Sequence, residues 1–246
     1  MTKNPHGWAR PDLDARLSAH VRAWQKTKHT DSPRSPEFHQ FITISRQYGC
    51  EGAALAHRLV DILNERCRPS FAWVAYDHEL LNKISTDPHL RKNVVEALDS
   101  HRHERMGRLF DTILNRKAND ASEMRQLADV VRTLAVLGRA VLLGRGSYLI
   151  TQDLKTGLHV KLVAPLDWRA LHVAATREVS HGEAKKIVIE GDRRREQYLR
   201  KHFVEHPEHI IDPDLVIDNS RFNLVQIGEI VFTALSTRLG KMLVKA

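Results

Sequence analysis

Five short apolar segments, separated by longer helical stretches, most strongly constrain what this chain can fold into. The segments read FITIS, FAWVAY, AVLLG, HVKLVA and DLVIDN, and their length is typical of buried strands. The stretches between them, such as EGAALAHRLVDILNERC and LDWRALHVAATREV, are mostly helical in pattern. Strands that alternate with helices form a parallel sheet covered on both faces. The sequence therefore predicts an α/β fold of three layers.

The first 37 residues are predicted to be an N-terminal helical extension and linker. An apolar stripe at spacings of four, four and three is typical of an amphipathic helix; it consists of Leu13, Leu17, Val21 and Trp24. The two prolines of HTDSPRSPE then end the pattern, as in a linker. This helix is expected to dock on its own domain or on the partner in a homodimer, and a nucleic-acid-binding arm is the alternative.

Residues 38 to 246 are predicted to form the main domain. A polar, strand-free insert from about residue 85 to 138 is expected to form a helical cap over the carboxyl edge of the sheet. Ligands of open α/β sheets bind at that edge. Functional side chains are therefore expected just after the strand ends.

Charge favours an anionic ligand. The chain has 38 Lys and Arg against 30 Asp and Glu, with a pI near 9.7. Its basic residues are spread along the sequence, and zinc-finger spacing and an aromatic-rich RNA-binding signature are absent, so nucleic acid is not the expected partner. No apolar run reaches membrane-spanning length, and the first residues lack a signal-peptide core. With only Cys50 and Cys67, these features predict a soluble protein of the reducing cytoplasm, with no membrane association.

The stretch ITISRQYGCEGAALA reads as strand, turn and helix. Gly49 and Gly52 permit left-handed turns and close approach of the backbone to an anion, and the helix start adds its amides and positive dipole end. The full phosphate-loop motif continues with a lysine and a hydroxyl residue. Here Gly52 stands at the lysine position, followed by Ala53 and Ala54. An ordinary tight turn is the alternative interpretation.

Polar residues follow the other strands as well. Asp77 is placed either to bind magnesium or a sugar hydroxyl, or simply to cap the next helix. Arg145 lies between two glycines, and a guanidinium there suits a phosphate. In GDRRREQYLRKHF, Asp192 and Arg195 share a helical face that is either functional or solvated, and Arg169 is a further candidate. No structural metal site is predicted, because Pro207 interrupts the spaced histidines near the end of that segment.

Together these segments resemble the cytidylate-kinase-like family, a branch of the P-loop nucleoside monophosphate kinases. The resemblance runs from about Phe41 to Leu235 and rests on ITISRQYGCEGAALA, AYDHELL, VLLGRGSYLI, VKLVAPLDWR, DRRREQYLRKHF and DLVIDNS, in that order. It implies a P-loop-type sheet of five parallel strands. It also implies ATP, with Mg²⁺, as phosphoryl donor and a (deoxy)cytidine monophosphate-like acceptor.

The resemblance assigns roles to particular residues. The donor phosphates would be cradled by Arg46, Gln47, Tyr48, Gly49, Cys50, Glu51, Gly52, Ala53 and Ala54. The acceptor would contact Asp77, Lys83, Arg145 and Asp192. A lid at about residues 184 to 203 would close on the transferring group through Arg193 or Arg195, and Arg46 is the nearest stand-in for the missing lysine.

The chain departs from the family pattern at several of these positions. Gly52 and Ala54 replace a lysine and a threonine, Gly146 replaces an aspartate that contacts the acceptor sugar, and Glu51 places a negative charge in the loop. Phosphoryl transfer to a cytidylate-like acceptor therefore competes with a second hypothesis, a catalytically silent regulatory or interaction module. Cys50 is either a small filler at a serine position or a reactive thiol near a helix N-terminus.

Overall fold

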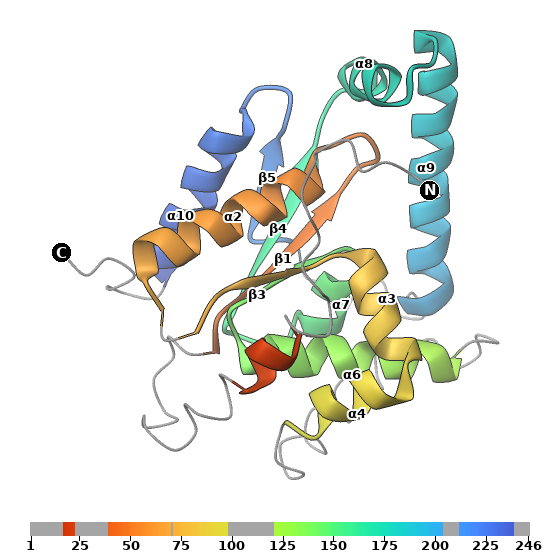
Figure 1. Ribbon diagram of the computed structural model, residues 1–246. Helices are drawn as coiled ribbons and strands as arrows, with labels where there is room; N and C mark the ends of the chain where they lie inside the picture. Colours follow the sequence, from red (N-terminus) through yellow and green to blue (C-terminus); the bar gives the residue numbers. More distant parts are fainter. Residues whose placement is uncertain (1–16, 23–38, 70, 98–120, 204–211, 239–246) are drawn as a thin grey trace.

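The computed structural model describes residues 17–22, 39–69, 71–97, 121–203 and 212–238. Its centre is one sheet of five parallel strands in the order β2-β3-β1-β4-β5 (Figure 1). The strands are β1 (Phe41–Arg46), β2 (Val74–Tyr76), β3 (Ala140–Leu143), β4 (Gly157–Val163) and β5 (Leu215–Asp218). The predicted five-stranded parallel sheet is confirmed, and each strand overlaps its predicted segment.

Helices cover both faces of the sheet (Figure 1). On one face lie α2 (Gly52–Cys67) and α10 (Leu224–Arg238). On the other lie α3 (His78–Thr86), α4 (Pro88–Val95), α6 (Ala121–Leu137) and α7 (Ser147–Thr151). The last pair, α8 (Leu166–Arg177) and α9 (His181–Phe203), pack on each other beside the carboxyl edge. In the ranges that the structure describes, no helix combines the length and apolarity needed to cross a membrane.

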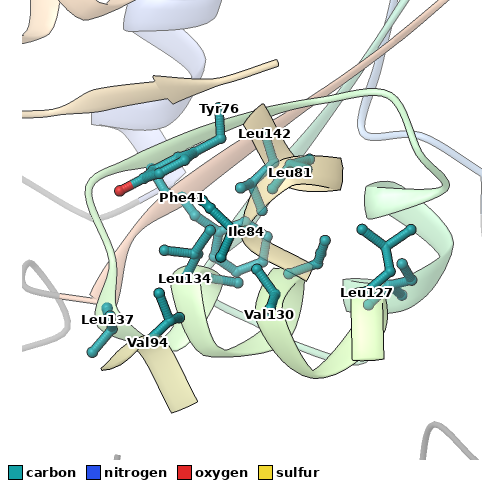
Figure 2. Packing of buried hydrophobic residues seen from close by; sticks show 14 of the residues in the cluster. Phe41, Tyr76, Leu81, Ile84, Val94, Leu127, Val130, Leu134, Leu137 and Leu142 are labelled. Atoms are coloured by element: carbon teal, nitrogen blue, oxygen red, sulfur yellow. The ribbon is translucent and has the colours of Figure 1, made fainter. Parts of the chain in front are cut away.

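Strand β3, in the interior of the sheet, is apolar on both sides and carries no polar alternation. In β3, Ala140 and Leu142 face one buried cluster while Val141 and Leu143 face the other. Figure 2 shows the first cluster, where side chains of the strands meet Val130, Leu134 and other residues of α6. Burial of this kind contributes roughly 25 cal/mol per Å² of apolar surface. The second cluster lies under α2 and α10.

Helix α6 explains where the predicted insert goes. Leu134 and other residues of its second half are fully buried against the sheet, so this part forms a layer of the fold. Its first turns instead reach the carboxyl side, near Arg145. Before it in the chain, Asp77 and Asp87 are the N-cap residues of α3 and α4. Their carboxylates accept hydrogen bonds from backbone amides of the first turn of each helix. Residues 98–120 of the insert lie outside the described residues.

Part of the N-terminal extension packs on the domain. Residues 17–22 are helical, and Leu17 and Val21 are buried in the cluster of Figure 2. His20 Nε2 donates to the Gly138 carbonyl oxygen at 3.1 Å, and its Nδ1 bonds the Tyr76 hydroxyl. Burial lowers the pKa of His20 to about 4. These contacts agree with docking of the helix on its own domain; Leu13, Trp24 and the linker lie outside the described residues.

Candidate functional site

Two regions make up the candidate site at the carboxyl edge of the sheet. The first is the loop, residues 46–54, between β1 and the first turn of α2. The second is the Arg145 pocket, which follows β3 and lies beside α3, α6 and α9. Both regions lie where the sequence predicts functional side chains, just after the ends of strands.

Arg46 connects the loop with the end of β3. A Cβ atom on Gly52 would lie 3.1 Å from Arg46 Cδ, and one on Gly144 would lie 2.3 Å from Arg46 Nη1. The Arg46 side chain therefore runs across one glycine and reaches the other, next to Arg145. Burial, and secondly the charge of Arg195, lower the pKa of Arg46 to about 10. The guanidinium remains a cation at neutral pH.

Helix α9 brings Arg195 to the loop. Its Nη1 donates to the Arg46 carbonyl oxygen at 2.9 Å, and its guanidinium carbon lies 5.1 Å from the centre of the Tyr48 ring. The ring packs on Gly191, where a Cβ would come within 2.3 Å of it. Only glycine fits between α9 and the loop at that point.

The structure does not bring the second lid arginine to the loop. Arg193 is exposed, and its Nε and Nη2 donate to the Glu190 carboxylate at 2.8 Å each. The Nε of its neighbour Arg194 lies 3.8 Å from Glu190 Oε1. Of the two lid arginines singled out by the family resemblance, Arg195 alone contacts the loop.

Asp192 contacts the loop rather than open space. Its Oδ1 accepts the Tyr48 amide at 2.7 Å, and its Oδ2 accepts Arg169 Nη1 at 2.5 Å. Arg169 is buried and also donates to the carbonyl oxygens of Tyr48, at 3.0 Å, and Ala164, at 2.9 Å. Gly49 has φ +90°, and a Cβ there would lie 2.9 Å from Arg169. The loop, α8 and α9 thus meet around one carboxylate.

Most other amides of the loop also bond to the protein. The further donors are Gln47 to Leu162 O at 3.0 Å, Cys50 to Gln47 O at 3.3 Å, Glu51 to Asn219 Oδ1 at 2.9 Å and Gly52 to Cys50 O at 3.0 Å. The Glu51 carboxylate turns toward Asn219 and accepts its Nδ2 at 3.4 Å. The first turn of α2 has no side-chain cap. Ala53 and Ala54 lie in that turn, so they are the loop residues best placed to offer amides to an anion.

Cys50 lies in an apolar setting. Burial raises the pKa of its thiol to about 11, and the residue packs against the cluster under α2 and α10. A raised pKa lowers the thiolate fraction at neutral pH, and the thiolate is the reactive form. The structure therefore argues against the reactive-thiol hypothesis and favours the small-filler interpretation.

Asp77 caps α3, with Oδ1 accepting the Leu80 amide at 2.9 Å. Its charge also acts on the site, because it raises the pKa of Arg46 against the effect of burial. The two interpretations of Asp77 are thus compatible. His78, the next residue, has its pKa lowered by burial and then by Arg145 and Arg46.

Arg145 has an unusual backbone conformation. Its φ of 55° is left-handed, as are those of Gly144 at 74° and Gly146 at 68°. A non-glycine residue in this region costs about 1–3 kcal/mol and is typical of functional sites. The side chain is held by a 2.6 Å bond from Nη2 to Asn82 Oδ1, and the guanidinium carbon lies 5.4 Å from the Tyr198 ring centre. Its Nε is buried without a partner in the described part of the chain.

A pocket of about 160 Å³ opens beside this guanidinium. It is lined by Asn82, Ser85, Thr86, Glu123, Met124, Gln126, Leu127, Arg145, Tyr198 and His202. Lys83 is exposed on α3 and is not part of this lining. At Gly146, where the family has an aspartate, a Cβ would lie 2.5 Å from the Phe203 ring. Phe203 thus fills the space that a side chain at position 146 would need.

Comparison with known proteins agrees with this geometry. Residues 41–221 match the model of the cytidylate kinase-like family. The chain belongs to this family. This cytidylate kinase-like protein has no match among the curated proteins. A crystal structure of an uncharacterized protein from Eubacterium ventriosum ATCC 27560 matches it with a TM-score of 0.59 and 16% identity, over 81% of this chain and 99% of the other.

Family and fold together show that the cytidylate kinase-like protein has a kinase-like nucleotide-binding fold. At 16% identity the solved structure supports the fold alone. Within the described residues, no group of three or more His, Cys, Asp or Glu side chains is arranged to hold a metal ion. A magnesium ion of a kinase needs less, because it is bound by one or two carboxylates together with substrate phosphates.

Sequence reasoning missed several residues of the site. Asn219 holds the Glu51 amide, and its only signal was its place after the last strand, in DLVIDNS. Asn82 and Tyr198 hold Arg145 from two different helices. No sequence signal announced them, because their contacts join segments 63 and 53 positions away from Arg145 (145 − 82 and 198 − 145).

Proposed function

We propose that this protein binds ATP at the loop and a cytidine monophosphate-like acceptor in the Arg145 pocket, and transfers a phosphoryl group between them. The observation that carries the proposal is the position of Arg46. Its aliphatic carbons lie against Gly52 in the loop and its guanidinium lies against Gly144 beside Arg145, so one side chain extends from the donor region to the acceptor region. Arg195 adds a second cation at the same place.

The residues present fit a phosphate group, although by a different donor set from the usual lysine and threonine. Arg46 and Arg195 offer two guanidinium groups, which match phosphate oxygens in charge and geometry. The uncapped start of α2 adds amides and the positive end of a helix dipole. Asp77 is the carboxylate at this edge that would serve Mg²⁺. When bound, ATP supplies the phosphoryl group.

The chain's own part in the reaction is positioning and charge neutralisation, which dominate phosphoryl transfer. Arg145 would hold the acceptor phosphate, in a geometry fixed by Asn82. Arg46 and Arg195 would face the charge that develops between the two nucleotides; removing one such electrostatic donor from an enzyme typically costs about 2.7–4 kcal/mol. Helix α9 covers the loop and would exclude water from it.

A second candidate function is a catalytically silent kinase-fold module with a regulatory or interaction role. It is favoured by the occupied loop amides and by the absence of a lysine, a hydroxyl and an aspartate at Gly52, Ala54 and Gly146. The first candidate requires both nucleotide binding and catalysis, whereas the second requires no catalysis.

Calorimetric titration with ATP–Mg²⁺ and with CMP, followed by a coupled ADP-release assay over the nucleoside monophosphates, separates the candidates. Turnover with CMP above the other acceptors is the expected result. Binding without ADP release would leave the silent module. If neither nucleotide binds, the assignment of both regions is wrong.

A further inference from the structure

The carboxylate of Asp192 sits on the loop in the way that a bound anion would. One oxygen accepts the Tyr48 backbone amide at 2.7 Å, and the other accepts a guanidinium N–H of Arg169 at 2.5 Å. A phosphate group presents the same kind of oxygen pair to the same two donor types. The contact therefore marks a place where this loop binds negative charge.

One donor of this place, Arg169, is held by contacts that do not involve Asp192. Arg169 is only 6% exposed and is held by the carbonyl oxygens of Tyr48 and Ala164. Gly49, with its positive φ, lets the loop backbone lie directly against Arg169. Asp192 is less enclosed, with a third of its side chain exposed. Arg169 is thus buried and held by the backbone, whereas its present partner, the Asp192 carboxylate, is partly exposed to solvent.

We propose that Arg169 and the Tyr48 amide form a phosphate subsite of the loop, and that Asp192 occupies it as an internal anion when no ligand is bound. A polyphosphate ligand must then displace the carboxylate before it gains these contacts. The proposal rests on the proposed function only in taking the ligand to be the polyphosphate of a nucleotide.

Displacement also acts on helix α9. Neighbouring contacts tie this helix to the loop: Asp192 with the Tyr48 amide, Gly191 with the Tyr48 ring, and Arg195 with both the Arg46 carbonyl and the Tyr48 ring. Release of Asp192 removes the first of these contacts and leaves the others. Occupation of the subsite and the position of α9 are therefore coupled, because the ligand favours the state in which the carboxylate has left.

Asp192→Asn tests the proposal. The substitution keeps size but removes the charge that competes for Arg169. Calorimetric titration with inorganic tripolyphosphate is expected to show binding about tenfold tighter than in the unsubstituted protein, which is ~1.4 kcal/mol. Arg169→Gln added to Asp192→Asn should remove this gain. Glu196→Gln is the matched control, because it deletes one exposed charge from the same helix, where Glu196 pairs with Arg200 at 2.6 Å.

Unchanged or weaker tripolyphosphate binding by Asp192→Asn would overturn the proposal, and so would an equal gain from Glu196→Gln. If Asp192→Asn fails to fold, the unsubstituted protein decides the matter. Tripolyphosphate should shift the NMR resonances of the Asp192 carboxyl carbon and the Tyr48 amide together, and an unmoved carboxyl resonance at saturation would overturn the proposal. A gain for tripolyphosphate without any ATP binding would reject the proposed function and still support the subsite.

Discussion

The loop and the Arg145 pocket lie at one edge of the sheet, but they differ in how many of their hydrogen-bonding groups are free to bind a ligand. In the loop, the amides of Gln47, Tyr48, Cys50, Glu51 and Gly52 all donate to acceptors of the protein itself. In the pocket, Arg145 keeps a buried Nε without a partner in the described residues, beside about 160 Å³ of open space. The acceptor region is thus open to a ligand, while the donor region is closed by its own chain.

This difference has a consequence for binding order. A donor ligand must first break charge-assisted hydrogen bonds such as that between Arg169 and Asp192, whereas an acceptor finds its arginine already oriented by Asn82. Pre-organised groups bind more tightly because less ordering remains to be done. We therefore expect the ligand-free protein to bind CMP more readily than ATP.

The largest expected effect comes from restoring the family's aspartate in the pocket with Gly146→Asp. Position 146 has φ 68°, and a Cβ there would lie 2.5 Å from the Phe203 ring. The backbone strain of ~1–3 kcal/mol and the overpacking of ~1–3 kcal/mol should together lower the free energy of unfolding by about 2–6 kcal/mol, as measured by urea denaturation.

Gly182→Asp is the control for that experiment. Gly182 is exposed near the start of α9, without positive φ, and a Cβ there meets nothing within 4 Å. The free energy of unfolding of the Gly182→Asp variant should match that of the unsubstituted protein. If Gly146→Asp is equally stable, Phe203 does not block the position and the pocket is less constrained than its geometry indicates.

The next largest effect is expected for Arg145→Ala. Hydrogen bonds to charged groups contribute ~1.5–3 kcal/mol, so CMP affinity should fall about 10- to 150-fold in a calorimetric titration. ATP affinity should change much less, because Arg46 and Arg195 hold the donor region. Arg200→Ala, which removes an exposed arginine of α9 paired with Glu196, should alter neither. An equal loss of affinity for CMP and ATP would mean that Arg145 contributes to both binding regions, and the two regions would then not be distinct.

The same contrast explains what could be predicted from the sequence. The sheet and the strand-end positions of Arg46, Asp77 and Arg145 follow from apolar runs and local turn chemistry, and these are short-range signals. Whether a charged side chain faces a ligand or another part of the chain depends on contacts over long sequence separations. Asp192 and Arg193 are adjacent in sequence, yet one binds the loop and the other binds Glu190. The residues around Asp192 in the sequence do not indicate whether its carboxylate faces solvent or binds the amide of Tyr48.

A smaller effect is expected when the loop regains its lysine through Gly52→Lys. A Cβ there would lie 3.1 Å from Arg46 Cδ and 3.2 Å from Leu143 Cδ1, so a shift of the flexible Arg46 side chain makes room. The gain in helix propensity over glycine, ~1 kcal/mol, offsets part of this cost, and stability should change by less than about 1 kcal/mol.

ATP affinity of Gly52→Lys should rise, on the order of tenfold, since an added cation reaches the phosphates. Gly52→Met adds a comparable side chain without the charge and is the matched control. Equal ATP titrations for the two variants would show that the closed loop, rather than the missing lysine, limits donor binding. That result would indicate that ATP binding is limited by the need to displace Asp192 from the loop.

The last prediction leaves nucleotide binding and stability untouched and concerns Cys50, whose alkylation reports how closed the loop is. Burial raises its pKa from 9.0 to about 11, so the thiolate fraction at pH 7 falls ~100-fold below that of a free thiol. In a Cys67→Ser background, iodoacetamide should therefore react with Cys50 far more slowly than with a small free thiol. The rate should keep rising steeply between pH 10 and pH 11, where the rate of a free thiol is close to its plateau, and should become fast in urea. Reaction at the free-thiol rate in the native protein would mean that the loop opens readily, and the loop would then be as accessible as the Arg145 pocket.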